Sequence, residues 1–352
     1  MDQQLDQELN ISQAIALAVD RRDLSREDMR AVMRQIMSGG ATPVQVAGFM
    51  VALRMKGETV DEITAAAEVM RELAVGVRVD VPNLVDIVGT GGDGSALFNV
   101  STASGFVVAA AGGHVAKHGN RSITSKSGSA DMLEAAGVAL DVPADCVADC
   151  VRELGVGFMF APKHHGSMRY AAVPRKELGV RTLFNVLGPL TNPANAPSMV
   201  MGVYAEQWLE PLAAVMHLLG ARHVLVVHSH DGLDEISLAE ATEVAELHQG
   251  KIHRYQITPE QFGIKRQPLT SMIVTGPEQS VSLVRSALGG KAGSVADMIA
   301  LNAGSAIYAA DLTDTLTEGI ARAQAILKSG TALAKLDALI AKTQACRNST
   351  HD

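Results

Sequence analysis

Aromatic residues are scarce in this chain of 352 residues, since Phe, Trp and Tyr together make up 3% of it. Proteins that bind single-stranded nucleic acid stack bases on aromatic side chains, so this composition argues against that class. The formal net charge of −8 argues against a general nucleic-acid binder, which would carry a basic surface. Neither number excludes a small, local anion pocket.

Cysteine is also rare, with only Cys146, Cys150 and Cys346. Their spacing matches neither a disulfide framework nor a zinc motif. Cys146 and Cys150 lie four residues apart on a predicted helix, where we expect them to be small core residues. Reduced cysteines fit a cytoplasmic protein best.

Long apolar runs are missing as well, and no segment is long enough to span a bilayer. The N-terminal sequence Met-Asp-Gln-Gln lacks the basic start and apolar core of a signal peptide. We therefore expect a soluble intracellular protein that does not bind membranes. The 47% of hydrophobic residues is enough for a large core, and the length predicts two domains.

Residues 1–80 contain helix signals and no alternating strand pattern. Ser25 begins a predicted helix that stops at Gly39, and Thr42 followed by Pro43 begins another. Thr59 is placed to cap a third helix. The sequence therefore predicts a small all-helical N-terminal domain over residues 1–80, on which residues of about 164–190 pack.

From residue 81 to residue 352, short apolar strands alternate with helices, which is typical of a mainly parallel sheet flanked by helices. A hairpin is expected to turn at Gln249 and Gly250, and the tail is helical from Val295 onward. This part is predicted to be the larger α/β domain. The expected strands are 85–88, 114–117, 156–160 and 223–228, and the expected helices are 101–111, 130–136, 143–154 and 208–219.

Acidic residues are absent between Asp93 and Asp131, although the chain is acidic overall. This window opens on a glycine-rich loop, residues 89–94, whose backbone can approach a ligand closely. It also carries several cations and many Ser and Thr hydroxyls, which bind oxygen anions. A window of this kind is what a polyphosphate site needs.

The glycine loop by itself has other interpretations. It matches G-x-G-x-x-G, but a dinucleotide fold also needs an acid about twenty residues later, where this chain has His114, Lys117 and His118. No Gly-Lys-Ser/Thr follows, so it is not a P-loop. A plain glycine turn remains an alternative.

Three donor-rich segments follow the loop, each with a structural alternative. Residues 99–102 begin a helix, where Ser and Thr often serve only as caps, but a helix N-terminus also binds anions. Residues 117–122 follow a strand, where α/β sheets bind ligands, although the cations there could simply be solvated. Residues 126–129 form a further donor-rich turn. Coincidence is a poor explanation for four such segments together.

Asp234 and Glu235 form an acidic pair shortly after a predicted strand. Adjacent acids are commonly surface residues. Their oxygens also suit magnesium, which binds one or two carboxylates together with substrate phosphates. A polyphosphate and a carboxylate pair would repel each other without a divalent cation, so the two signals support each other.

Taken together, these residues resemble the anthranilate phosphoribosyltransferase family over essentially the whole chain. The most specific matches are residues 89–93, 99–102, 117–122, 126–131, 175–185, 188–193 and 232–237. The resemblance implies transfer of phosphoribosyl from 5-phosphoribosyl 1-diphosphate to the amine of anthranilate, with release of diphosphate, in tryptophan biosynthesis. It also implies a helical domain joined to an α/β domain, related to nucleoside phosphorylases, and a magnesium-dependent homodimer with two ions per subunit.

The resemblance also implies site residues. Anthranilate is expected to contact Gly89, Asn120 and Arg175, and the metal ions are expected at Ser101, Asp234 and Glu235. No residue is assigned as a certain catalytic group. Lys117 and bound magnesium are expected to stabilise the leaving group. The residues expected to bind the sugar diphosphate are Gly89, Gly92, Asp93, Asn99, Val100, Ser101, Thr102, Lys117, His118, Gly119, Asn120, Arg121, Ser122, Ile123, Thr124, Ser125 and Ser129.

Some roles stay open on the sequence. His118 is a candidate general base or a hydrogen-bonding group, and Arg175 could be an exposed helical cation. The chain departs from the family's commonest pattern at Leu97, Gly166 and Ser229. Two alternative functions remain for a protein of this fold. One is a pyrimidine nucleoside phosphorylase. The other is a non-catalytic paralogue that binds nucleic acid, which would be expected to lose the acidic pair or the cationic loop.

Overall fold

The computed structural model describes residues 9–122 and 126–349, which divide into two compact units. The helical unit comprises residues 1–74 and 165–191, and the α/β unit comprises residues 75–164 and 192–352. The chain thus leaves the α/β unit once and returns to it. No described helix is both long and apolar enough to cross a bilayer.

The helical unit is built on four N-terminal helices with strong start signals. They are α1 (Ile11–Val19), α2 (Arg26–Met37), α3 (Pro43–Lys56) and α4 (Val60–Glu72). The side chains of Asn10, Ser25, Thr42 and Thr59 each accept a hydrogen bond from a backbone N–H in the first turn, which explains where the helices begin. The predicted caps at Ser25, Thr42 and Thr59 are confirmed.

Two further helices complete this unit, α9 (Arg169–Leu178), which packs on α2 and α3, and α10 (Leu183–Leu190), which packs on α3 and α4. Inside the unit, Lys56 Nζ lies 2.9 Å from Glu62 Oε2, and both side chains are buried. Glu62 Oε1 also accepts the Leu24 N–H, so this buried charge is paired on both oxygens.

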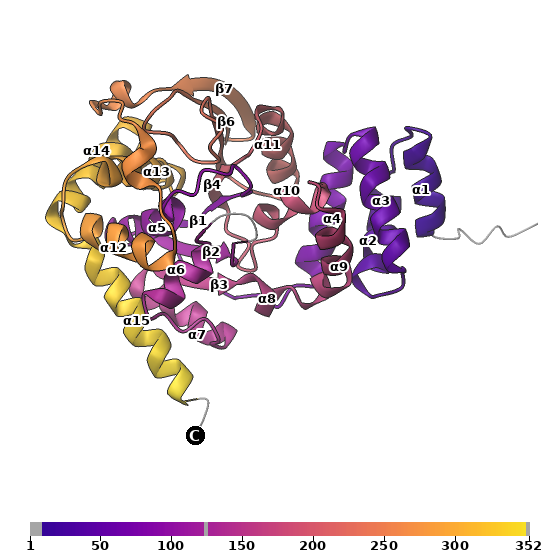
Figure 1. The fold of residues 1–352 in the computed structure, drawn as a ribbon, viewed down its shortest axis with the longest axis horizontal. Coiled ribbons are helices and arrows are strands. Elements are labelled where there is room, and N and C mark those ends of the chain that lie inside the picture. Colours follow the sequence, from indigo (N-terminus) through magenta and orange to yellow (C-terminus); the bar gives the residue numbers. More distant parts are fainter. Residues whose placement is uncertain (1–8, 123–125, 350–352) are drawn as a thin grey trace, which may run out of the picture. The chain divides into compact units, whose positions relative to one another are not determined.

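The α/β unit contains a seven-stranded sheet with helices on its faces (Figure 1). The strand order is β3-β2-β1-β4-β5-β6-β7; β1 to β5 run parallel, and β6 and β7 are antiparallel additions. The expected fold class is confirmed. The strands are β1 (Leu84–Gly89), β2 (His114–Gly119), β3 (Val156–Phe160), β4 (Ser198–Gly202), β5 (His223–Ser229), β6 (Thr242–His248) and β7 (Lys251–Ile257).

Alternating residues of the strands face two different cores. Val85, Ile87 and Val115 point into the larger core, which includes α5 and α13, whereas Leu84 and Ala116 belong to a second cluster near α7. Burial on both faces explains why these strands are nearly continuous apolar runs. The helices are α5 (Val100–Ala110), α6 (Ser129–Ala135), α7 (Ala144–Asp149), α8 (Ala161–His164), α11 (Leu209–Leu218), α12 (Pro277–Leu288), α13 (Ser294–Ala309), α14 (Leu316–Ser329) and α15 (Ala332–Ser349).

The expectation for the cysteines is wrong for two of them. Cys146 on α7 and Cys346 on α15 form a disulfide, with 6.4 Å between their Cα atoms, whereas Cys150 is free and buried. The two partners are 200 residues apart in sequence, and only the packing of α15 beside α7 brings them together. Sequence spacing could not reveal this pair. Cys150 also begins a π-helical turn, residues 150–154, that ends the predicted helix 143–154.

Candidate functional site

The acidic pair lies directly against the glycine loop in the α/β unit. The loop leaves β1 at its carboxyl end, and the Gly91 N–H donates to Asp234 Oδ2 at 2.6 Å. A Cβ atom at Gly89 would lie 2.3 Å from Asp234 Oδ2, and one at Gly202 would lie 1.6 Å from the Asp234 carbonyl oxygen. Because β1 and β4 are neighbours, their terminal glycines together make room for this segment.

Asp234, Glu235 and Asp93 form a cluster of interacting carboxylates. Burial, and then the charge of Asp93, raises the pKa of Asp234 to about 7. Burial and the charge of Asp234 raise the pKa of Glu235 to about 8. Buried carboxylates whose pKa is raised by a neighbouring carboxylate are short of positive charge, and an all-oxygen donor set fits magnesium. This cluster therefore fits the expected metal.

Lys117 is the cation that faces this cluster from β2. Its side chain is buried; Nζ donates to the Ile87 carbonyl at 2.6 Å and to Ser101 Oγ at 3.2 Å. The Ser101 N–H in turn donates to Glu235 Oε1 at 3.3 Å. Burial lowers the pKa of Lys117, and the charges of Asp86, Glu235 and Asp234 oppose that effect. The two ligand sets predicted separately, for phosphate and for metal, therefore meet at Ser101.

Sequence reasoning missed Asp86 and Asn192, which support this corner of the site. Asp86 is fully buried in β1 and accepts hydrogen bonds from the His118 N–H at 3.3 Å and from Asn192 Nδ2 at 2.7 Å. Burial raises the pKa of Asp86 to about 6, against the charge of Lys117. The sequence did contain a signal for Asp86, since it is an acidic residue within an otherwise apolar strand. A buried carboxylate needs partners nearby to compensate for its lost hydration.

Asn99 connects the start of α5 to the third donor-rich turn. Asn99 Nδ2 donates to the Ser127 carbonyl at 3.0 Å, and Ser127 Oγ donates to Asn99 Oδ1 at 2.8 Å. Ser280 Oγ on α12, a partner not expected from the sequence, also donates to Asn99 Oδ1. No side chain caps α5, and Thr102 Oγ1 is buried without a hydrogen-bond partner within the described ranges. The anion-binding interpretation of this helix start therefore fits better than the cap.

The cationic loop after β2 is closed by Asp131 at the start of α6. Asp131 Oδ2 accepts the N–H groups of Ser122 at 3.0 Å and Gly128 at 2.9 Å. The Arg121 guanidinium pairs with Asp131 at 3.1 Å and with Glu134 at 2.7 Å, so it is engaged on the protein surface. Ser129 Oγ donates to the Asn120 carbonyl at 3.2 Å. The expected contacts of Ile123, Thr124 and Ser125 lie outside the described residues.

Arg175 lies in the helical unit, on α9. Its side chain is half-buried, and its guanidinium lies 5.5 Å from the centre of the Phe184 ring. Burial lowers the pKa of Arg175, and within the described parts of the chain no carboxylate pairs with it. The half-buried guanidinium of Arg175 therefore does not match the alternative interpretation, which was an exposed cation on a helix. Such an arginine is suited to a planar anion such as a carboxylate.

Ser229 and Leu97, two departures from the family pattern, have structural roles. Ser229 is buried and donates through Oγ to Asp231, whose other oxygen accepts Ser237 Oγ at 2.6 Å. These bonds close the turn that precedes Asp234. Leu97 pairs with Ile273 in an isolated β-bridge and packs against the larger core. Gly166 begins a short 3-10 turn in the helical unit.

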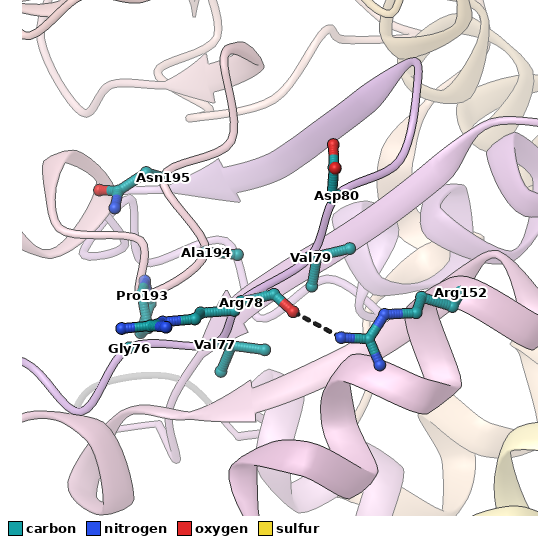
Figure 2. Close-up of a pocket in the computed structure, with 9 residues that line it drawn as sticks. All are labelled: Gly76, Val77, Arg78, Val79, Asp80, Arg152, Pro193, Ala194 and Asn195. Atoms are coloured by element: carbon teal, nitrogen blue, oxygen red, sulfur yellow. Dashed lines mark hydrogen bonds between the residues drawn. The ribbon is translucent and has the colours of Figure 1, made fainter.

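A hollow of about 510 Å³ in the α/β unit lies at a different set of residues (Figure 2). It is lined by residues 76–80 and 193–195 together with Arg152, and none of these is a predicted site residue. The Arg152 guanidinium donates to the Arg78 carbonyl at 2.8 Å and pairs with Asp149. Its charge is thus already compensated within the protein.

Comparison with protein families supports the two-part architecture. A family model described as the glycosyl transferase family, a/b domain, matches residues 81–333. A second, described as the glycosyl transferase family, helical bundle domain, matches residues 12–74.

Individual relatives and solved structures agree with these matches. An anthranilate phosphoribosyltransferase from Alkalilimnicola ehrlichii is 56% identical and covers 96% of this chain and 99% of that protein. The structure of the enzyme from Thermus thermophilus has a TM-score of 0.90 and 46% identity, covering 94% of this chain and 99% of that one. The Saccharomyces cerevisiae enzyme in complex with PRPP and Mg has a TM-score of 0.86 and 28% identity, covering 95% and 98%.

Proposed function

The chain belongs to the anthranilate phosphoribosyltransferase family, and from that membership and the geometry of the α/β unit we propose how its residues act. The enzyme transfers the phosphoribosyl group of 5-phosphoribosyl 1-diphosphate to the amine of anthranilate and releases diphosphate, a step of tryptophan biosynthesis. The phosphorylase and nucleic-acid-binding alternatives are not favoured.

The donor-rich segments of the α/β unit bind the sugar diphosphate. The glycine loop and the start of α5, which has no side-chain cap, offer backbone N–H groups beside the buried Lys117, and two of these groups, those of Gly91 and Ser101, bond to the acidic pair. Thr102 Oγ1, which has no partner within the described ranges, is available for a ligand oxygen. The proposed contacts are Gly89, Gly92, Asp93, Asn99, Val100, Ser101, Thr102, Lys117, His118, Gly119, Asn120, Arg121, Ser122 and Ser129, with Ile123, Thr124 and Ser125 outside the described residues.

Asp234, Glu235 and Ser101 hold magnesium, with two ions per subunit. Bound there, magnesium would neutralise the negative charge of the diphosphate beside these carboxylates. The cluster supports this assignment because burial and the charge of a neighbouring aspartate raise the pKa of both acids, an effect that a divalent cation would reverse. The Gly91 N–H fixes Asp234 Oδ2, so the carboxylate is oriented before any ligand binds.

The chemistry that the protein assists is departure of the diphosphate. An arylamine is already neutral at pH 7, so the nucleophile needs no strong base. Lys117 and the loop N–H groups stabilise charge that grows on the leaving oxygen while the sugar becomes oxocarbenium-like. His118 acts as a hydrogen-bonding group; its backbone N–H donates to the buried Asp86 carboxylate, which fixes the residue near the end of β2.

Gly89, Asn120 and Arg175 contact anthranilate. Arg175 is the charged member of this set, and its guanidinium fork is complementary to the anthranilate carboxylate. Its half-burial and the absence of an acidic partner in the described part of the chain support this role.

Cytoplasmic location is proposed from membership of a tryptophan-biosynthesis family and not from reduced cysteines, since Cys146 and Cys346 form a disulfide. Homodimerisation through the N-terminal helices and the division into domains at residues 1–80 and 81–352 complete the proposal. The helical unit exposes Val19, Val44 and Met55, at 66%, 81% and 73% of their surface, and an interface would cover such side chains. The compact units support the domain division, with residues 165–191 joining the N-terminal helices.

The contact of Asp234 with the glycine loop carries the proposal, and an isosteric double variant tests it. Asp234→Asn together with Glu235→Gln removes both charges while keeping the side-chain volume. We expect turnover to fall by at least about 100-fold, the scale of losing one electrostatic contact to the transition state, and magnesium dependence to weaken. Glu240→Gln, a nearby exposed acid, is the control. Full activity of the double variant in an assay that follows anthranilate fluorescence would refute the metal role.

A further inference from the structure

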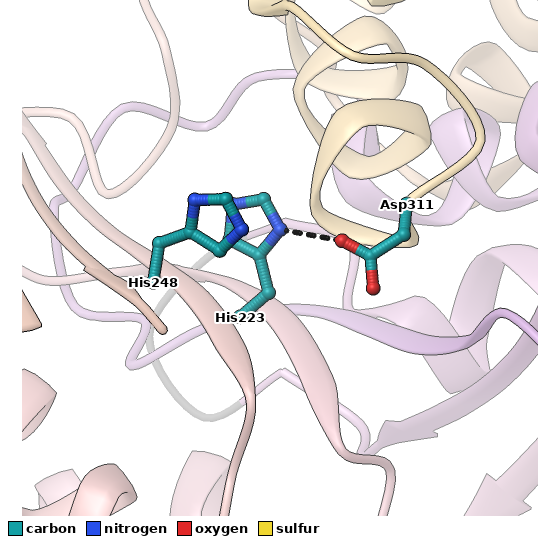
Figure 3. Close-up of side chains that lie close together, drawn as sticks. All are labelled: His223, His248 and Asp311. Carbon is teal, nitrogen blue, oxygen red and sulfur yellow. Dashed lines mark hydrogen bonds and ion pairs between the residues drawn. The ribbon is translucent and has the colours of Figure 1, made fainter. Parts of the chain in front are cut away.

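A second cluster of metal-ligating side chains lies at another place in the α/β unit (Figure 3). His223 begins β5, His248 ends β6, and Asp311 follows α13. One potential ligand atom from each of the three lies within 4.8 Å of the others. His223 and His248 are direct cross-strand partners, so the sheet register fixes their two rings side by side.

His223 already has the environment of a metal-binding histidine. Its Nε2 lies 2.9 Å from Glu246 Oε1, and Glu246 Oε1 also accepts the Tyr308 hydroxyl at 2.8 Å. A carboxylate that accepts one ring N–H fixes the ring orientation and the tautomer, which is the usual outer partner of a metal-bound imidazole. With Nε2 committed to Glu246, Nδ1 is the nitrogen directed at Asp311.

The distance between the ligand atoms of His223 and Asp311 already fits a small transition-metal ion. His223 Nδ1 lies 3.0 Å from Asp311 Oδ1, and two ligand atoms on a tetrahedral zinc ion lie about 3.3 Å apart. The His248 ring stacks on His223 with 4.2 Å between centroids and 12° between planes. His248 is half-buried, and its ring nitrogens have no hydrogen-bond partner in the described ranges. A side-chain shift of about 1.5 Å would bring it to bonding distance.

We propose that His223, His248 and Asp311 bind one divalent transition-metal ion of the zinc type, with water completing the coordination. Two imidazoles and one carboxylate select such ions over magnesium, which prefers oxygen ligands. On binding, the ion replaces any proton on His223 Nδ1, which leaves to solvent, and the proton on Nε2 stays in the hydrogen bond to Glu246. The Arg222 guanidinium, 3.8 Å from Asp311 and exposed, is displaced toward water.

The ion fastens the start of β5 and the end of β6 to the turn that follows α13. Its ligands come from two paired antiparallel strands and from the turn after α13, so the ion strengthens the link between the sheet and that turn. Metal binding therefore stabilises the folded α/β unit and leaves transferase chemistry unchanged, since none of the three residues belongs to the proposed substrate site.

The test is titration of the metal-stripped full-length protein with Co2+ in excess Mg2+, which keeps the carboxylate cluster occupied. We expect one Co2+ per chain with the visible absorption of four- or five-coordinate cobalt, and displacement by Zn2+. His248→Ala and Asp311→Asn should each weaken binding by at least about 10-fold. Asparagine suits position 311, because the backbone there has a φ of 56°. His230→Ala, which removes a histidine paired with Glu243 alone, is the matched control and should bind normally.

Thermal unfolding provides the second measurement. Zn2+ should raise the melting temperature of the wild type and of His230→Ala, and should leave that of His248→Ala unchanged. The Asp234→Asn and Glu235→Gln double variant should retain Co2+ binding, which separates this site from the proposed magnesium site. Absence of Co2+ binding in excess Mg2+, or binding that neither His248→Ala nor Asp311→Asn weakens, would overturn the proposal.

Discussion

At the scale of single residues, the site depends on positions where no side chain fits. Gly89 and Gly202 end two adjacent strands, and a Cβ on either would collide with Asp234. Sequence reasoning attributed Gly89 and the rest of the glycine loop to a ligand that approaches the backbone, and it did not single out Gly202. The structure adds a second reason, because the acidic pair itself occupies the space that a methyl group would need.

Gly89→Ala is therefore expected to damage the active site more than the fold. The new methyl would force Asp234 away by about 1 Å, and a misplacement of that size costs on the order of 100-fold in rate. Steady-state turnover and the melting temperature would be measured together. Gly105→Ala, on α5, is the control, since its Cβ would lie 3.4 Å from Val115 Cγ1 in ordinary contact. Equal losses of activity in both variants would count against this explanation.

Arg175→Ala is expected to weaken anthranilate binding selectively. Loss of a charged hydrogen-bonding partner costs about 1.5–3 kcal/mol, which corresponds to about a 10- to 100-fold rise in KM for anthranilate. The KM for the sugar diphosphate should change little. Lys176→Ala removes the exposed neighbouring cation and serves as the control. If both Michaelis constants of Arg175→Ala rose equally, its role toward the carboxylate would be wrong.

At the scale of elements, Asp131 connects α6 to the cationic loop. Burial alone would raise the pKa of Asp131, but hydrogen bonds from the Ser122 and Gly128 N–H groups and from Arg121 outweigh it and lower the pKa below the ordinary 3.8. A carboxylate whose folded pKa is lowered stabilises the fold above its unfolded pKa and loses that effect as the pH falls through the folded pKa.

Asp131→Asn should therefore lower the unfolding free energy near neutral pH and lose its difference from wild type in acid. Urea unfolding at about pH 6 and about pH 3 would measure this, because the two values bracket the ordinary aspartate pKa. The Ser122 and Gly128 amides should also exchange faster with solvent in the variant. Glu134→Gln, which removes an exposed partner of Arg121, should show a smaller effect. A constant difference between Asp131→Asn and wild type across this pH range would contradict the assignment.

At the scale of the whole molecule, one covalent link joins distant parts of the chain. The Cys146–Cys346 disulfide holds α15 to α7 across 200 residues of sequence. A link over so long a loop restricts the unfolded chain strongly, and the chain-entropy model gives an upper limit of about 5 kcal/mol.

Reduction of this disulfide is expected to lower the unfolding free energy by about 2–5 kcal/mol. Urea unfolding with and without a thiol reductant would measure the difference. Cys346→Ser should unfold like the reduced wild type and show no response to reductant. Cys150→Ala keeps the disulfide and should still respond. A wild type that unfolds identically in both conditions would show that the link does not stabilise the protein.

The sequence was informative where the causes of structure are local. Thr42 with Pro43, and Thr59 with Glu62, form caps within single turns, so those helix starts were predicted from neighbouring residues. Gln249 and Gly250 both adopt positive φ in the hairpin turn, and Gly250 is the residue whose type favours that conformation. No bounds were predicted for the helices α9 and α10; each carries a proline in its interior, Pro174 or Pro189, a residue that disfavours that position. β4 was missed because its methionines have no strong strand preference.

By itself the sequence determined which residues are able to bind phosphate or magnesium: a window without acids, a set of hydrogen-bond donors and an acidic pair. It also determined the alternation of strands and helices. Only the tertiary structure decided which of these residues meet. Asp234 bonds to Gly91 across 143 residues because β1 and β5 lie on either side of β4 in the parallel part of the sheet, so the loops that follow β1 and β5 leave the sheet at the same edge, above Gly202 at the end of β4. The disulfide and the His223 cluster depend on the same kind of long-range packing, which no local pattern encodes.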